Sequence, residues 1–194
     1  MDDALRAGCV ASPLLGPVAM DRGNHWNPSQ LDRTINGMKR VLVVHYSQSG
    51  QLTAVLRSIV APLENRPDIE VVYENIEPVQ DYPFPWPFFD FLDVFPESVY
   101  LDPAPIKPLK VDPESRFDLI ILGYTVWYLS PSQPVTAFLK SAAGRRLLAG
   151  TPVITVTACR NMWLTAQEKV KKLLTEAGAR HLDHVALIDQ SPAL

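Results

Sequence analysis

The sequence predicts one α/β domain built around a doubly wound parallel sheet. A chain of 194 residues, 47% of them hydrophobic, is long enough for one domain with a well-filled core and short for two. Brief apolar and β-branched runs alternate along it with segments whose apolar residues recur at helical spacing. Such alternation is typical of right-handed βαβ crossovers, which place successive strands parallel in one sheet.

Five runs are expected to be strands, and the first is the clearest. Residues 41–46 are apolar or β-branched at almost every position, as in a strand that is covered on both faces. The expected strands are 41–46, 69–73, 117–124, 151–157 and 184–188.

Two helices are expected in the first part of this pattern. After Gly50, apolar residues at helical spacing predict a helix over 52–63. A second helix is expected over 135–142, with Gly144 closing it.

A third helix is expected to begin at Thr165, because Thr165 and Glu168 have the spacing of a capping box, and to stop at Gly178. After the last strand only six residues follow. The final helix that should cover one sheet face beside the first helix is therefore expected to be missing, through a truncated coding sequence or a partner that covers that face.

Two segments do not fit the alternation. Residues 1–37 show no period, so they are interpreted either as a flexible extension or, preferably, as sequence upstream of a true start at Met38, leaving 38–194 as the domain. Residues 78–113, inserted after the second strand, hold much of the proline and aromatic content. Prolines at this density exclude a long helix, and so many aromatics need cover, so the insertion is expected to form a lid or a homodimer interface.

Composition excludes several function classes. The net charge is −3 with scattered lysine and arginine, which argues against a nucleic-acid partner. Cys9 and Cys159 lie far apart and in no C-x-x-C pair, so neither a disulfide framework nor a metal site is expected, and a reducing cytoplasm is the expected location. The longest apolar stretch, 119–129, is shorter than the roughly 20 residues of a membrane-spanning helix.

In a parallel sheet, ligands bind beyond the carboxyl ends of the strands, so the loops after the first, third and fourth strands are the candidates. The first loop combines three hydroxyls with a glycine at a helix start, which suits a phosphate monoester; the alternative is an ordinary turn and helix cap. It lacks the lysine of a nucleoside-triphosphate loop and the G-x-G-x-x-G of a dinucleotide fold. The loop residues are Ser47, Gln48, Ser49, Gly50, Gln51, Leu52 and Thr53.

The other two loops are rich in aromatic residues that could face a planar ring. The third-strand loop includes Tyr124, Thr125, Val126, Trp127 and Tyr128, with core packing of Trp127 as the alternative. The fourth-strand loop includes Arg160, Asn161 and Trp163, where a cation could stabilise an anionic reduced ring or simply lie on the surface.

The stretch 39–188 resembles the flavodoxin-like superfamily, which implies a strand order 2-1-3-4-5 and bound FMN. By this resemblance Ser47, Ser49, Gly50, Gln51 and Thr53 match the phosphate loop, while 124–127 and 160–163 match the loops that flank the isoalloxazine. Leu52 stands where many members have a hydroxyl, and the fourth-strand loop lacks their usual glycines.

Several motifs also resemble bacterial proteins named dialkylresorcinol condensing enzymes: 45–52, 82–86, 95–100 and 158–163. Condensation needs a reactive cysteine with histidines, which the sequence does not supply, so FMN-dependent oxidation of an alkylated cyclic dione to the aromatic product is preferred. Candidate catalytic residues are Tyr124, Tyr128 and Arg160. The alternatives are a general NAD(P)H-dependent quinone or flavin reductase, an electron-transfer flavodoxin, and a scaffold without flavin.

Overall fold

The computed structural model describes residues 37–188. The expected extension 1–37 lies outside the described residues except for Gly37, as do residues 189–194. Among the described residues no helix is both long and apolar enough to cross a membrane.

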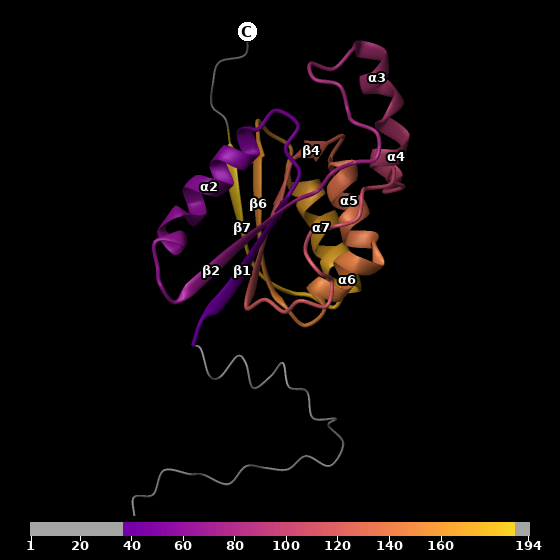
Figure 1. Ribbon diagram of the computed structural model, residues 1–194. Coiled ribbons are helices and arrows are strands. Elements are labelled where there is room, and N and C mark those ends of the chain that lie inside the picture. Colours follow the sequence, from indigo (N-terminus) through magenta and orange to yellow (C-terminus); the bar gives the residue numbers. More distant parts are fainter. Residues whose placement is uncertain (1–36, 189–194) are drawn as a thin grey trace, which may run out of the picture. The chain divides into compact units, whose positions relative to one another are not determined.

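Five parallel strands form the central sheet (Figure 1). The strands are β1 (Lys39–His45), β2 (Ile69–Asn75), β3 (Leu119–Tyr124), β6 (Pro152–Cys159) and β7 (Arg180–Ile188). Their order is β2-β1-β3-β6-β7, which confirms the expected order 2-1-3-4-5. Neighbouring strands β1 and β3 carry continuous apolar runs, as expected for strands whose two faces are both covered.

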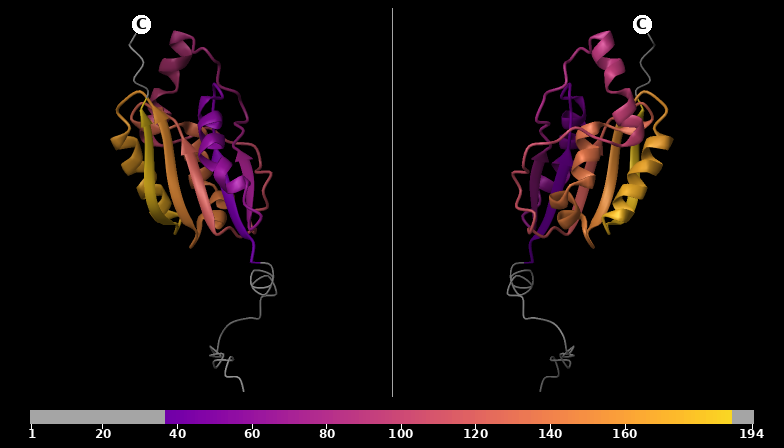
Figure 2. Two further views of the ribbon diagram at one scale, coloured as in Figure 1. Left: turned by 90° about the vertical axis from the view of Figure 1, so that its left-hand side faces the viewer. Right: turned by 90° about the vertical axis from the view of Figure 1, so that its right-hand side faces the viewer.

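Helices cover the two faces of the sheet unequally (Figures 1 and 2). Helix α2 (Gln51–Glu64) lies on one face, and α5 (Gln133–Lys140), α6 (Ala142–Leu148) and α7 (Leu164–Glu176) lie on the other. Successive residues of β1 alternate between two cores: Val41 and Val43 pack with α2, whereas Leu42 and Val44 join the larger core beneath α5 and α7.

Part of the face beside α2 is open among the described residues. Within the described residues α2 is the helix on this face, and β7, at the sheet edge, presents exposed apolar side chains. These are Leu182, Val185, Leu187 and Ile188.

The expectation that Gly144 closes a helix is wrong. Helix α5 ends at Lys140, and α6 starts at once because the Ser141 hydroxyl accepts a hydrogen bond from the Gly144 N–H (2.9 Å) and caps the new helix. Gly144 is buried inside α6 against the carbonyl of Phe138.

The expected capping box of the third helix is also wrong. Helix α7 begins at Leu164 with Trp163 as its N-cap, and no side chain caps it. Thr165 therefore lies inside the first turn instead of preceding it. The helix ends before Gly178, whose φ of 72° is the left-handed stop that was expected.

The insertion 78–113 contains two short helices, α3 (Phe88–Asp93) and α4 (Phe95–Tyr100), near the carboxyl ends of the strands (Figures 1 and 2). Buried Gln133 of α5 anchors it, because its amide accepts from the Tyr82 hydroxyl (2.8 Å) and donates to the Val94 carbonyl (3.2 Å). The expectation that its aromatics are covered is wrong in part, since Phe84, Phe88, Phe89, Phe91 and Phe95 are all exposed.

We predict that Gly144→Ala destabilises the protein, although alanine normally favours a helix interior by roughly 1 kcal/mol over glycine. A Cβ at this position would lie 2.0 Å from the Phe138 carbonyl oxygen, so the α5–α6 junction has to shift. We expect a loss of about 2 kcal/mol in the free energy of unfolding, measured by urea denaturation. Exposed Arg145→Ala in the same helix should change it by less than about 0.5 kcal/mol, and an equal effect of the two variants would contradict the prediction.

Candidate functional site

The loops after β1, β3 and β6 all lie at the same edge of the sheet, where the parallel strands end (Figure 1). Strand β1 lies between β2 and β3, and β3 lies between β1 and β6, so the three predicted loops are close neighbours in space. The insertion helices approach this edge from the side of α5.

The start of α2 has the properties of an anion site. Its N-cap is Gly50 in the left-handed conformation (φ 81°), no side chain caps the helix, and no acidic residue lies in its first turn. The N–H groups at such an end lack intrahelical partners, and the helix dipole adds positive potential. Ser47 is partly exposed, and Ser49 and Gln51 are exposed, with the Ser49 hydroxyl donating to Oε1 of Gln51 (3.4 Å). These polar groups lie beside the N–H groups and are accessible from solvent.

Three side chains of the predicted phosphate loop have other partners. Leu52 is 1% exposed and packs in the core. The Gln48 amide donates to the Pro83 carbonyl (2.7 Å) and accepts from the Trp86 indole (3.0 Å), so it ties this loop to the insertion. Thr53 Oγ1 lies 2.9 Å from Nε2 of His45.

Sequence reasoning missed the role of His45 at the end of β1. Its ring is 3% exposed, and burial, with a smaller effect of the Arg57 charge, lowers its pKa to about 4. Nδ1 is buried without a hydrogen-bond partner, whereas Nε2 faces Thr53. Because an orphaned lone pair is more readily tolerated than an orphaned N–H, we assign the proton to Nε2, which leaves the Thr53 hydroxyl free to donate to a ligand.

The aromatic side chains after β3 are mostly committed to packing. Tyr124 is fully buried and its hydroxyl donates to Oε1 of Gln167 (2.8 Å); burial raises its pKa. The Tyr124 side chain is therefore removed from the candidates that contact a ligand. Trp127 belongs to an aromatic cluster with Tyr82 (ring centroids 4.9 Å apart) and Trp86 (5.3 Å), which agrees with core packing.

Tyr128 links the same loop to the insertion. It and Leu129 form a tight turn with φ of 49° and 60° between the short strands β4 (Val126–Trp127) and β5 (Ser130–Pro131). The Tyr128 hydroxyl donates to the Phe91 carbonyl, and its ring packs 4.9 Å from that of Phe95. Its position thus depends on the insertion.

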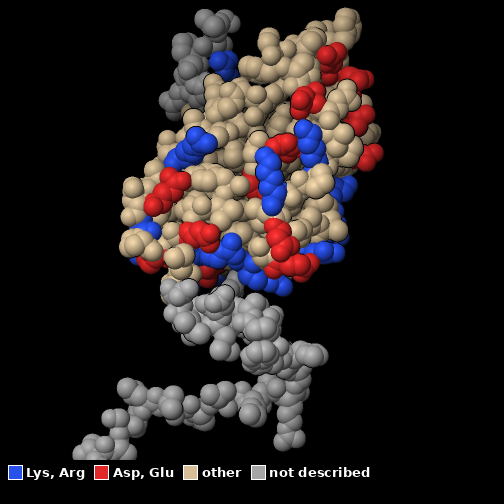
Figure 3. Space-filling view, viewed as in Figure 1, with Lys and Arg blue, Asp and Glu red and all other residues tan. Residues whose placement is uncertain are grey.

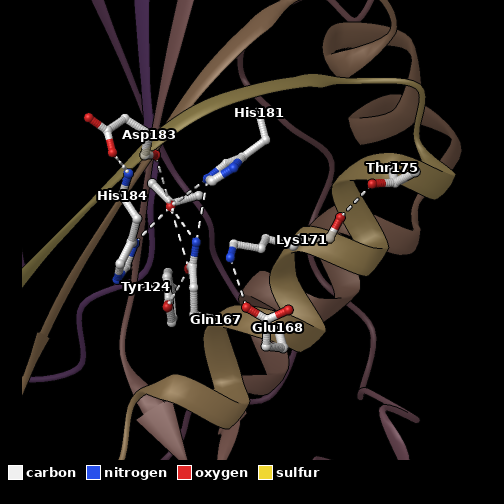
Figure 4. Close-up of polar contacts among 9 residues, drawn as sticks. Tyr124, Gln167, Glu168, Lys171, Thr175, His181, Asp183 and His184 are labelled. Carbon is white, nitrogen blue, oxygen red and sulfur yellow. Dashed lines mark hydrogen bonds and ion pairs between the residues drawn. The ribbon is translucent and has the colours of Figure 1, made fainter.

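The loop after β6 exposes Arg160 and Asn161 and turns Trp163 inward. The ring of Trp163 packs 4.9 Å from His184. Below it, Thr155 lies at the centre of a polar network (Figure 4), in which its hydroxyl contacts His184 Nδ1 (2.8 Å) and His181 Nε2 (3.1 Å) and accepts from the Gln167 amide (3.1 Å). This network joins β6 to β7 and to α7.

Cys159 is partly exposed, but its surroundings do not favour the thiolate that a nucleophile needs. Burial raises the pKa of its thiol, which keeps it protonated near neutral pH. It lines a groove of about 710 Å³ together with Gln51 and Val55 of α2 and with Arg160. The loop that carries Arg160 and the start of α2 therefore border the same groove.

Carboxylates gather along the side formed by α3 and α4 (Figure 3). Five carboxylates of the insertion line a hollow of about 520 Å³ that also borders Gln133 of α5: Asp81, Asp90, Asp93, Glu97 and Asp102. Within residues 37–188, no cluster of three or more His, Cys, Asp or Glu side chains is arranged to hold a metal ion.

Comparisons with known proteins bear on the fold. No family model and no curated protein matches the chain. A flavoprotein solved in complex with FMN from Lactobacillus acidophilus NCFM shares 17% identity, with a TM-score of 0.60 over 76% of this chain and 93% of that chain. A protein of Bacteroides uniformis ATCC 8492 assigned as a flavoprotein shares 16%, with a TM-score of 0.60 over 79% and 93%. The chain has the flavodoxin-like fold.

We predict that His45 makes stability depend on pH. Its folded-state pKa of about 4 lies below the ordinary 6.5, so the unfolded chain binds more protons between these values and stability rises with pH there. Acidification from pH 7 to 4 should cost about 3 kcal/mol through this residue; the lowered pKa values of His181 and His184 act in the same direction.

The measurement is urea denaturation of wild type and His45→Gln across that range. The carboxylates and the other histidines titrate in both proteins, so the difference between the two slopes isolates His45. Identical slopes would contradict the prediction.

Proposed function

We propose that the chain binds FMN and acts as an FMN-dependent oxidoreductase. The observation that carries the proposal is the uncapped start of α2 directly after β1, with Gly50 in the left-handed conformation and serine hydroxyls beside it. This arrangement suits a phosphate monoester, and the flavodoxin-like fold supports FMN as the compound that bears it.

The residues present fit the phosphate end of FMN. Ser47, Ser49 and Thr53 supply hydroxyls, and the first N–H groups of α2 supply backbone donors. No acidic residue in the first turn opposes the phosphate charge. His45 acts as a positioning residue, because its Nε2–H would turn the Thr53 hydroxyl outward.

For the ring we propose the space flanked by the third and fourth loops, 124–128 and 160–163. With the side chains of Tyr124 and Trp127 packed inward, the backbone of Thr125 and Val126 is the part of the third loop left to contact the ring edge. Arg160 and Asn161 would contribute from the other side, and Trp163 holds their loop against the sheet.

When bound, FMN supplies two-electron redox chemistry, while the protein orients the substrate and limits access of water. We propose that the substrate is an alkylated cyclic dione that is oxidised to a resorcinol, in line with the resemblance to dialkylresorcinol condensing enzymes. Arg160 is the candidate that donates to the substrate oxygens, and the Tyr128 oxygen, whose proton is donated to the Phe91 carbonyl, can accept from a substrate hydroxyl. A cytoplasmic location completes the proposal.

We expect FMN to bind at least about tenfold more tightly than riboflavin, because only FMN uses the anion site at α2. Ser49→Asp should abolish this preference by placing a negative charge beside the phosphate. Isothermal calorimetry on the full chain measures both affinities. Ser58→Asp, an exposed position farther along α2, is the control and should keep the preference. Equal affinity of the wild type for FMN and riboflavin would contradict a phosphate site.

The reaction can be tested under anaerobic conditions with the FMN-loaded protein. An alkylated cyclohexane-1,3-dione should bleach the flavin absorbance, with resorcinol formed in equal amount, because the substrate loses a hydride to the flavin and a proton to solvent. NADPH and NADH serve as comparison reductants. If they bleach the flavin and the dione does not, the protein is a general quinone or flavin reductase.

A further inference from the structure

A second groove, of about 590 Å³, lies between α4, the β4–β5 turn and the start of α7. Its volume is within the range of small-molecule sites. Three of its apolar residues, Phe95, Leu129 and Met162, are 41% to 59% exposed. The groove is lined by Phe95, Val99, Val126, Leu129, Met162 and Lys169, among others.

Lys169 is the charged residue on the wall of this groove. Its partly buried ammonium group donates to the Ser130 hydroxyl (2.7 Å) and the Val99 carbonyl (3.3 Å). An ammonium group has three donors, so within residues 37–188 one donor is left over. The neighbouring carboxylate of Glu168 pairs with Lys171 (2.7 Å), and no described carboxylate pairs with Lys169.

The start of α7 adds positive potential to the same wall. Thr165, in the first turn of this 13-residue helix, lines the groove. No side chain caps the helix, and its first turn holds no acidic residue. The dipole of α7 and the charge of Lys169 therefore act together on a group in the groove.

We propose that this groove binds an apolar molecule that carries one oxyanion. The apolar body lies on Phe95, Leu129 and Met162, and the oxyanion accepts the remaining donor of Lys169. A neutral hydrocarbon would make no ionic contact with the Lys169 ammonium group. A compact polar anion would leave the apolar walls of the groove exposed to water.

The groove is also placed to serve the proposed oxidoreductase. Val126 and Met162 belong to the two loops between which we propose the ring to lie. That this ligand is the substrate rests on the proposed function. The binding of an apolar oxyanion in the groove does not, because it needs no flavin.

The test is calorimetry of the full chain, without flavin, with decanoate and decanol, which share the alkyl body and differ in the charge. We expect decanoate to bind at least about tenfold more tightly, and Lys169→Met to remove that difference. Lys172→Met, on the exposed side of the same helix, is the matched control and should retain it. Equal binding of the two probes to wild type, or no binding of either, would overturn the proposal.

A second variant covers the case in which Lys169→Met does not fold. Met162→Glu changes an exposed side chain on the rim and should weaken decanoate binding by placing a like charge in the groove, with an unchanged melting temperature. Unchanged decanoate affinity in this variant would overturn the location.

Titration of FMN into the decanoate complex separates the two proposals. Binding of both compounds at once supports a distinct substrate groove. Displacement of decanoate by FMN would show that the groove holds the ring and would overturn this inference alone. Failure of FMN to bind, with decanoate recognition intact, would overturn the proposed function and leave the oxyanion site.

Discussion

Burial of both faces of β1 and β3 determines how the other elements are arranged. Their apolar side chains alternate between the core under α2 and the core under α5 and α7, and each fully buried valine, leucine or isoleucine contributes about 1.5–3 kcal/mol. Because the two strands are parallel neighbours, their following loops leave the sheet at the same edge. The placement of the candidate site is thus a consequence of core formation.

Glutamine side chains connect this rigid sheet to the insertion. Gln133 is buried in α5 and holds Tyr82 and Val94, while Gln48 in the first loop holds Pro83 and Trp86. Proline-rich backbone offers few N–H groups for regular structure, so side-chain amides take over part of the hydrogen bonding. Hydrogen bonds therefore join the proposed phosphate loop to the insertion, whose helix α4 borders the second groove.

The strands could be located from the sequence because continuous apolar runs leave few alternatives, although β7 begins at Arg180 and not at 184 as expected. Their order came from the resemblance to the flavodoxin-like superfamily. Helix boundaries predicted from single capping residues were wrong in two places. Ser141 starts a helix at the point where Gly144 was expected to end one, and Trp163 occupies the cap position that the spacing of Thr165 and Glu168 suggested for threonine. In the first case the Ser141 hydroxyl caps the new helix, whereas α7 begins one residue before Thr165 without any side-chain cap.

The candidate loops could be located from the sequence, but the directions of their side chains could not. Tyr124 belongs to the core because Gln167, 43 residues away, accepts its hydroxyl hydrogen. Lys169 gave no signal, since its partners Val99 and Ser130 are 70 and 39 residues distant. Such contacts depend on the packing of separate elements and leave no local pattern.

The aromatic cluster around Trp127 gives the protein a built-in optical label. Trp86 reaches it from the insertion and lies 5.3 Å from Trp127, which is anchored in the loop after β3. Indole emission responds to the polarity around the ring, so separation of the insertion from the sheet would change the emission of Trp86 and Trp127, in addition to the signal of the other two tryptophans of the chain. Comparison of this emission with the circular dichroism of the sheet would therefore show whether the two parts separate before they unfold.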